Sequence, residues 1–163
     1  MCIRDRYNRG IDWFEAAGYH HYEISNVAKS GHKSRHNLKY WSSGAWIGFG
    51  CGAHSTRDRR RWQNVSDVEL YIERVSDGLS PVASQKILSV DELVSDTLFL
   101  GLRLSEGVDL PSLESRFRVD VWGRWGLDLQ ICVDAGLLDE NSDRLRLTRK
   151  GMLLANEVMR VFV

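Results

Sequence analysis

The chain has 163 residues, of which 43% are hydrophobic and 27% are charged, and these ordinary values exclude a disordered, collagen-like or repetitive protein. The 22 basic and 22 acidic side chains cancel to a net charge of +0, which argues against a strongly basic nucleic-acid-binding protein or a polybasic membrane protein. No apolar run approaches the roughly 20 residues that span a bilayer, so we expect no transmembrane segment.

The first third of the chain begins with a short charged segment. Residues 1–6 are too short and too charged for the apolar part of a signal peptide, and they do not merge into the pattern that follows. We interpret them as a non-native leader, with a frayed native terminus as the alternative. The apolar spacing then predicts a helix over 7–18 that ends at Gly18, and alternation predicts a short strand over 21–25.

The middle of the chain is richer in turn signals. Residues 26–45 are typical of a loop, 45–50 predict a second strand, and 57–62 predict a basic turn. The S-x-x-E spacing at Ser66 to Glu69 predicts a capping box at the start of a helix that Gly78 closes. The polar stretch that follows, up to about residue 88, is where we expect a domain boundary.

The last 75 or so residues have a different pattern. They predict a capped helix from Ser89, a short helix with Pro111 in its first turn, a helix that Asp120 caps and Gly136 ends, a hairpin over 137–147 with a turn at 141–143, and a final helix capped by Thr148. Three helices, a two-stranded wing and a closing helix are typical of a winged-helix module. Its candidate recognition helix carries acidic side chains and few basic ones, which favours protein packing over DNA binding.

Three cysteines, Cys2, Cys51 and Cys132, lie far apart and form no C-x-x-C pair. This disfavours a disulfide-stapled secreted domain and a local zinc or iron–sulfur motif, and it indicates a reducing compartment. We therefore expect a cytoplasmic protein. The five histidines suggest no preformed multi-histidine metal site, although a single axial haem ligand remains open.

Two segments carry most of the unusual residues. One spans 35–41 and combines histidine, asparagine, tyrosine and tryptophan, and the other, 48–55, has glycine at every second position up to residue 52. Glycines let a ligand approach the backbone, and exposed amides there bind carboxylates or phosphates. A glycine-rich turn with aromatic packing explains the same residues equally well. The arginines at 57 and 59–61 suit propionates, phosphates or nucleic acid, or simply a solvated loop.

Several motifs together resemble one known family. They are the segments at 22–28 (YEISNVA), 36–41 (HNLKYW), 48–55 (GFGCGAHS), 100–104, 107–110, 136–138 and 145–148. In this order they resemble radical S-adenosylmethionine proteins related to oxygen-independent coproporphyrinogen III oxidase, and within these the haem-chaperone branch of HemW type. The resemblance runs from about residue 7 to the end of the chain.

The resemblance implies an α+β chain with two parts. Residues 7–80 would supply the terminal strands and helices of an incomplete radical SAM α/β barrel, and residues 88–163 would form a helical, winged-helix-like C-terminal domain. Family members bind a 4Fe-4S cluster through a C-x-x-x-C-x-x-C motif, and S-adenosylmethionine binds to that cluster. The motif is absent from this sequence, so we expect a C-terminal fragment whose parent protein carries both cofactors.

The resemblance also implies a set of site residues. The residues expected to face the cofactor are Asn37, Leu38, Gly50, Gly52, Ala53 and His54, and the candidates for haem or substrate contact are His36, Tyr40 and Trp41. No catalytic residue and no metal ligand is expected. Two positions depart from the family: Ser34 stands where cysteine is frequent, and Cys51 where proline is frequent.

The resulting hypothesis is a haem chaperone fragment that binds haem or another tetrapyrrole and passes it to haem-accepting apoproteins. The fragment alone is not expected to be catalytic. The first alternative is an oxygen-independent coproporphyrinogen III dehydrogenase, which decarboxylates its substrate oxidatively. The second is a winged-helix module that binds nucleic acid, although we expect no nucleic-acid partner.

Overall fold

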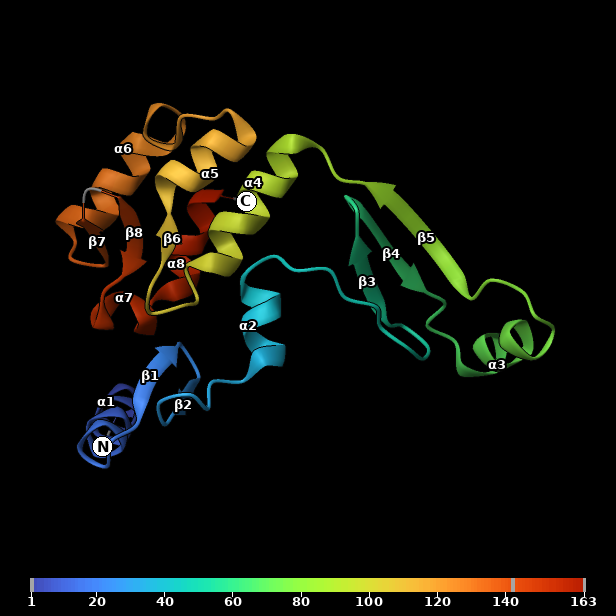
Figure 1. Cartoon of the computed structure of the whole chain (residues 1–163), viewed down its shortest axis with the longest axis horizontal. Coiled ribbons are helices and arrows are strands. Elements are labelled where there is room, and N and C mark those ends of the chain that lie inside the picture. The colour runs from blue at the N-terminus through green and yellow to red at the C-terminus, as the bar shows by residue number, and fades with distance from the viewer. Residues whose placement is uncertain (1, 142, 163) are drawn as a thin grey trace. The chain divides into compact units, whose positions relative to one another are not determined.

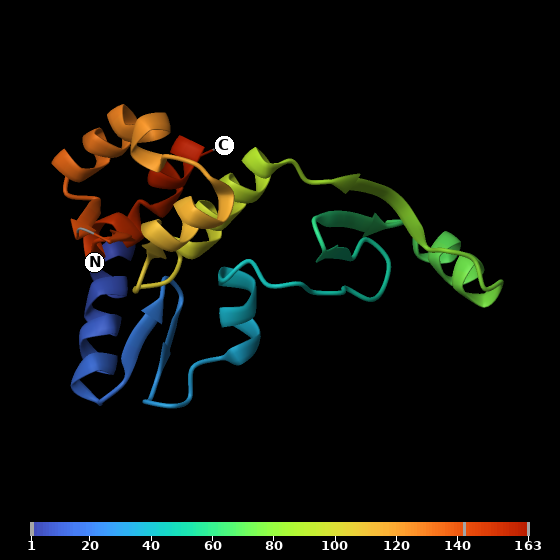
Figure 2. The ribbon, with the colours of Figure 1, turned by 45° about the horizontal axis from the view of Figure 1, so that its top comes forward.

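The computed structural model describes residues 2–141 and 143–162. Met1, Ser142 and Val163, which belong to the predicted leader, wing turn and C-terminal domain, lie outside the described residues. The chain forms two compact units (Figures 1 and 2). Unit 1 comprises Met1–Ser43 and Val94–Val163, and unit 2 comprises Gly44–Leu93. None of the described helices is long and apolar enough to cross a membrane.

The N-terminal part of unit 1 contains α1 (Ile3–Ala16), β1 (His20–Glu23), β2 (Asn26–Ala28) and α2 (Arg35–Trp41). The predicted first helix is present, but it begins four residues earlier and includes part of the expected leader, because Cys2 and Asp5 cap it. β1 and β2 form an antiparallel hairpin. Because sequence analysis predicted only loop over 26–45, it missed both β2 and α2.

The C-terminal part of unit 1 is mainly helical. Its elements are α4 (Val90–Gly101, which belongs to unit 1 from Val94 onward), β6 (Val108–Asp109), α5 (Leu110–Phe117), α6 (Val121–Asp134), β7 (Leu138–Asn141), β8 (Arg144–Leu147), α7 (Arg149–Leu153), α8 (Ala155–Met159) and the short 3-10 helix η1 (Arg160–Phe162). The strands form an antiparallel sheet in the order β6-β8-β7. The predicted caps at Asp120 and Thr148 are confirmed, because each side chain accepts a hydrogen bond from an amide in the first turn of its helix.

The core of unit 1 lies between these helices and the small sheet. Leu98, Leu129, Leu145 and Val158 are fully buried, and the aromatic rings of Trp125 and Phe162 meet edge to face at its margin. Burial of several such side chains is the main source of stability for a domain of this size. Helices α4 and α6 therefore contribute Val94, Leu98 and Leu129 to this core.

The N-terminal hairpin is joined to the C-terminal part of unit 1 through main-chain hydrogen bonds. The Ile24 N–H donates to the Arg103 carbonyl at 3.0 Å, and the Ser105 N–H donates to the Tyr22 carbonyl at 3.1 Å. An antiparallel bridge pairs Glu23 with Leu104 between these bonds. The segment after α4 therefore extends the edge of β1, and the two parts of unit 1 share one continuous structure.

Unit 2 contains β3 (His54–Arg57), β4 (Arg60–Asn64), α3 (Val68–Ser76) and β5 (Val82–Ile87). The strands are antiparallel in the order β3-β4-β5 (Figure 1). The predicted strand over 45–50 is wrong: only Trp46 forms a bridge there, with Thr56. The predicted basic turn is a hairpin, and the polar stretch after residue 79 contains β5. Asp67 caps α3 in place of Ser66.

The start of α4 is a confirmed capping box. The Ser89 N–H donates to Glu92 Oε2 at 2.9 Å, and the Glu92 N–H donates to Ser89 Oγ at 3.1 Å. The Lys86 ammonium lies 2.6 Å from Glu92 Oε1. The hydrogen bond from Lys86, together with the backbone bond from Ser89, lowers the pKa of Glu92 to about 2.

Candidate functional site

Helix α2 carries the aromatic and histidine residues that sequence analysis singled out. Ser34 begins the helix by accepting a hydrogen bond from the Asn37 N–H at 3.3 Å. The rings of His36 and Tyr40, one helical turn apart, meet at 4.9 Å in an edge-to-face arrangement. The imidazole of His36 is exposed, whereas Asn37, Leu38 and Tyr40 are half-buried. The helix therefore presents one imidazole to the outside beside an aromatic ring.

The end of α2 is held by a contact that sequence analysis missed. The Arg103 guanidinium lies over the Trp41 ring, 4.3 Å from its centroid. Arg103 follows α4 and is distant in sequence, so no local pattern could indicate this pair. Two buried nitrogens here, Trp41 Nε1 and Arg103 Nε, have no hydrogen-bond partner among the described residues. Both are donors, and burial without an acceptor costs such groups stability.

The segment 22–28 contacts the start of α2 and contains buried polar side chains. Tyr22 is buried, and its hydroxyl accepts a hydrogen bond from the Ser34 N–H at 3.3 Å. Glu23 is fully buried, and its Oε1 accepts from the Asn26 amide, while its Oε2 has no partner among the described residues. The Tyr7 hydroxyl donates to the Ile24 carbonyl at 2.7 Å. Burial raises the pKa of Tyr7, against the opposing effect of the Arg149 charge.

The glycine-rich segment of unit 2 is occupied mainly by its own internal contacts. The N–H groups of Gly50, Gly52 and Ala53 donate to the Tyr71 hydroxyl, the Val65 carbonyl and the Gly50 carbonyl. Gly50 and Gly52 have φ of 101° and 67°, values that favour glycine. These glycines are thus explained by the turn. The exposed side chains of Phe49, Cys51 and His54 are what this segment offers to a ligand.

The predicted site residues therefore divide between the two units. Those of unit 1 are His36, Asn37, Leu38, Tyr40 and Trp41, and those of unit 2 are Gly50, Gly52, Ala53 and His54. The five in unit 1 share one short helix with a defined cation partner. In unit 2, the backbone N–H groups of Gly50, Gly52 and Ala53 already have acceptors within the chain. The predicted residues of unit 1 thus lie together on α2, whereas the amides of the glycine-rich segment are occupied by internal hydrogen bonds.

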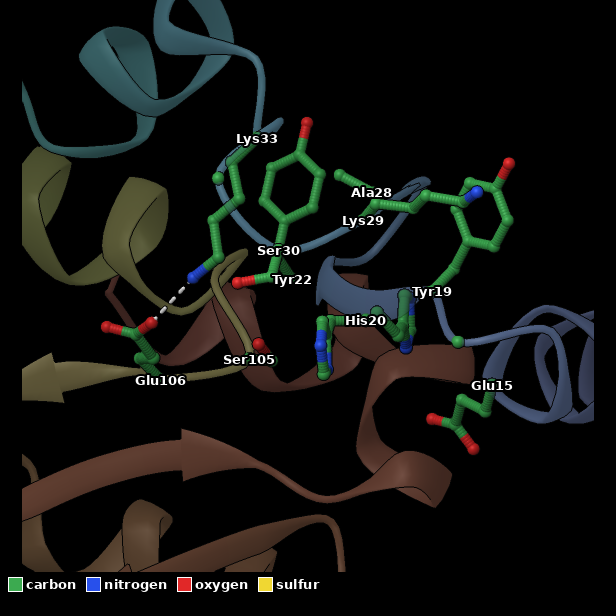
Figure 3. A pocket seen from close by; sticks show the side chains of 13 residues that line it. Glu15, Tyr19, His20, Tyr22, Ala28, Lys29, Ser30, Lys33, Ser105 and Glu106 are labelled. Carbon is green, nitrogen blue, oxygen red and sulfur yellow. Dashed lines mark hydrogen bonds and ion pairs between the residues drawn. The ribbon is translucent and has the colours of Figure 1, made fainter.

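A pocket of about 590 Å³ opens beside β1 in unit 1 (Figure 3). Its side chains include Tyr19, Tyr22, Lys29, Lys33 and Glu106. The two ammonium groups lie over the two tyrosine rings, Lys29 over Tyr19 at 5.5 Å and Lys33 over Tyr22 at 6.0 Å. Lys33 also pairs with Glu106 at 2.9 Å, and this hydrogen bond lowers the pKa of Glu106. Sequence analysis assigned no role to this pocket, although Tyr22 and Ala28, at the two ends of the 22–28 motif, line it.

The residues present do not fit an iron–sulfur cluster. Cys132 is buried in the helical core of unit 1, and Cys51 is exposed on the loop of unit 2. No group of three or more histidine, cysteine, aspartate or glutamate side chains among the described residues is arranged to hold a metal ion. A single exposed imidazole such as that of His36 can still serve as an axial ligand of a haem iron.

Comparison with known proteins gives a consistent family relationship. Residues 88–154 match the family model of the HemN C-terminal domain. The chain is 36% identical over 149 residues to the haem chaperone HemW of Bacillus subtilis, which covers 91% of this chain and 39% of that protein. It is 37% identical over 148 residues to the haem chaperone HemW of Mycobacterium tuberculosis, covering 91% and 36%. The chain thus spans less than half the length of these relatives.

The fold also matches a solved structure. Coproporphyrinogen III oxidase (HemN) from Escherichia coli, described as a radical SAM enzyme, aligns with a TM-score of 0.75 over 95% of this chain and 39% of that one. The sequence identity in this alignment is 16%, so the likeness concerns the fold alone. Residues 88–154 are thus similar to the HemN C-terminal domain, most of the chain is similar in sequence to proteins named haem chaperone HemW, and its fold is similar to that of HemN.

Proposed function

We propose that this chain belongs to a haem chaperone and that helix α2 contacts the haem. The observation that carries this proposal is the exposed imidazole of His36, which lies beside Tyr40 on a helix fixed by the Trp41–Arg103 contact. An imidazole is a common axial ligand of haem iron, and a flanking aromatic ring packs well against a porphyrin.

The relatives support this choice over an oxidase. The proteins that match the sequence over most of its length are named haem chaperones. We propose that residues 7–80 belong to a radical SAM barrel and that residues 88–163 form a winged-helix-like domain. The 4Fe-4S cluster and S-adenosylmethionine would belong to other parts of such a protein, and haem-accepting apoproteins in the cytoplasm would be its partners. Helix α6, the candidate recognition helix of a nucleic-acid-binding module, exposes Leu127, Asp128 and Ile131. These side chains are poor groups for binding a phosphate backbone, which disfavours that alternative.

The test is a haem titration of the whole chain, followed by its absorption spectrum. We expect the His36→Ala variant to lose the Soret band of ligated haem and to bind haem at least tenfold more weakly. His32→Ala is the matched control, because His32 is also an exposed histidine of unit 1 but lies outside α2. If both variants bind haem as the parent chain does, α2 does not hold the iron.

The alternative is a coproporphyrinogen III dehydrogenase, which the fold of the HemN structure favours. The two functions predict different ligands for the same chain. A chaperone should prefer iron porphyrin, and this preference should depend on His36. A dehydrogenase should prefer the metal-free tetracarboxylate coproporphyrinogen III, and this preference should not depend on His36. Titration with both compounds therefore separates the functions without requiring turnover.

A further inference from the structure

A second feature, separate from α2, lies on one face of the sheet in unit 2. The register pairs Arg57 with Arg60 and Trp62 with Gln85. Directly paired residues and residues two positions apart along a strand project to the same side of a sheet, so these four side chains share one face. Together with Asp58 and Val82, they line a hollow of about 410 Å³.

This face carries a repulsive pair of charges. Arg57 and Arg60 lie directly opposite each other across the hairpin, and like charges in this position destabilise a strand pair. Arg57 lies 3.3 Å from Asp58, but both side chains are largely exposed, so this ion pair is weak. Among the described residues, Arg60 forms no ion pair. An anion bound between the two guanidinium groups would relieve the repulsion.

The turn between the two arginines is held in an unusual conformation. Asp58 and Arg59 have φ of 51° and 66°, in the left-handed region that two-residue hairpin turns normally fill with asparagine or glycine. The Arg59 guanidinium donates to the Leu88 carbonyl from Nη2 at 3.0 Å, and the Leu88 N–H donates to the Arg59 carbonyl at 2.8 Å. The turn is thus fixed to the end of β5, which holds Arg57 and Arg60 side by side.

We propose that this face binds a flat dianion, namely a porphyrin whose two carboxylates meet Arg57 and Arg60 while its ring packs against Trp62. The two propionates of haem project from one edge of the ring, and each guanidinium can bind one carboxylate through two parallel hydrogen bonds. A tryptophan provides the large flat surface that a porphyrin ring requires. Gln85 borders the hollow and can donate to the same carboxylates.

The choice of a porphyrin rests on the proposed function, whereas recognition of a flat ring with two anionic groups rests on unit 2 alone. The test therefore uses protoporphyrin IX without iron, which requires no histidine ligand. Its fluorescence is titrated with the whole chain, and the Arg57→Gln/Arg60→Gln double variant is compared with the parent. We expect the dissociation constant to increase at least tenfold in this variant.

Two controls make the result specific. Arg61→Gln removes the same charge from the neighbouring position of β4, whose side chain lies on the opposite face with Lys86, and it should leave the dissociation constant within twofold. The dimethyl ester of protoporphyrin lacks both charges, so it should bind the parent chain as weakly as the acid binds the double variant. Removing the repulsive pair should not lower the melting temperature, so loss of folding will not mimic loss of binding.

The outcomes separate this proposal from the one for α2. If the parent and the double variant bind protoporphyrin equally, or if Arg61→Gln is equally weakened, the proposal for unit 2 is wrong, while dependence of haem binding on His36 would still stand. If binding depends on the arginines but haem binding does not depend on His36, the role of α2 is wrong and the face in unit 2 stands. Arginine-dependent binding of ADP that is tighter than that of protoporphyrin would overturn the choice of a porphyrin.

Discussion

Gly107 and Gly136 provide a matched pair for testing how closely the strands of unit 1 pack. Their φ angles are 66° and 67°, so alanine at either position must adopt the same left-handed conformation. Their surroundings differ. A Cβ at Gly107 would lie 2.2 Å from the Leu145 carbonyl oxygen and 2.5 Å from the Arg146 Cβ, whereas a Cβ at Gly136 would meet nothing within 4 Å. The difference between the two alanine variants therefore isolates the steric clash.

The left-handed conformation costs alanine about 1 kcal/mol, and overpacking adds about 1–3 kcal/mol. We therefore expect Gly136→Ala to lose about 1 kcal/mol of unfolding free energy and Gly107→Ala about 3 kcal/mol. With a urea m-value of about 2 kcal/mol/M, the unfolding midpoints fall by about 0.5 M and about 1.5 M. Urea titration followed by tryptophan fluorescence measures both. Equal midpoints for the two variants would show that β6 and β8 do not approach as closely as described.

Three further predictions concern single contacts. The pKa of Glu92, measured by NMR, should be about 2 instead of 4.5. The ion pair and cap that Glu92 forms stabilise the fold above pH 4.5 and are lost as the pH falls towards 2. Lys86→Met should raise the pKa of Glu92 towards 4.5. Burial shields the Cys132 thiol and raises its pKa. Iodoacetamide should therefore modify Cys51 in the native chain and Cys132 only in urea. Equal modification rates for the two thiols in the native chain would contradict the burial of Cys132. Arg103→Met should cost about 1 kcal/mol of unfolding free energy by removing the contact with Trp41, and an unchanged urea midpoint would contradict this.

Local signals predicted the C-terminal helices well. Asp120 and Thr148 cap their helices, and Gly136 ends α6 with the left-handed φ that a helix stop requires. Each of these signals acts within one helical turn, so the sequence contains all of the relevant interaction. The overall likeness to the HemW and HemN relatives was equally predictable, because it depends on several motifs in a fixed order.

The elements that sequence analysis missed depend on distant partners. β5 has polar, largely exposed residues without alternation, and it is a strand because β4 lies beside it. Helix α2 has no regular apolar face, and the Arg103 contact that holds its end comes from after α4. The segment over 45–50 has the composition of a strand, but Gly50 at φ 101° turns the chain away. The motif residues of α2 could thus be named from the sequence, whereas their supports could not.

The hydrogen bonds between β1 and the segment 103–105 have a consequence for synthesis on the ribosome. The partner of Tyr22 and Ile24 lies about 80 positions later in the chain. At about 5–20 residues per second, translation supplies that partner about 4–16 seconds after β1 has been made. During this interval the nascent chain exposes an unpaired strand edge, which invites pairing with another chain. Unit 1 therefore cannot complete its fold until its C-terminal part has been synthesised.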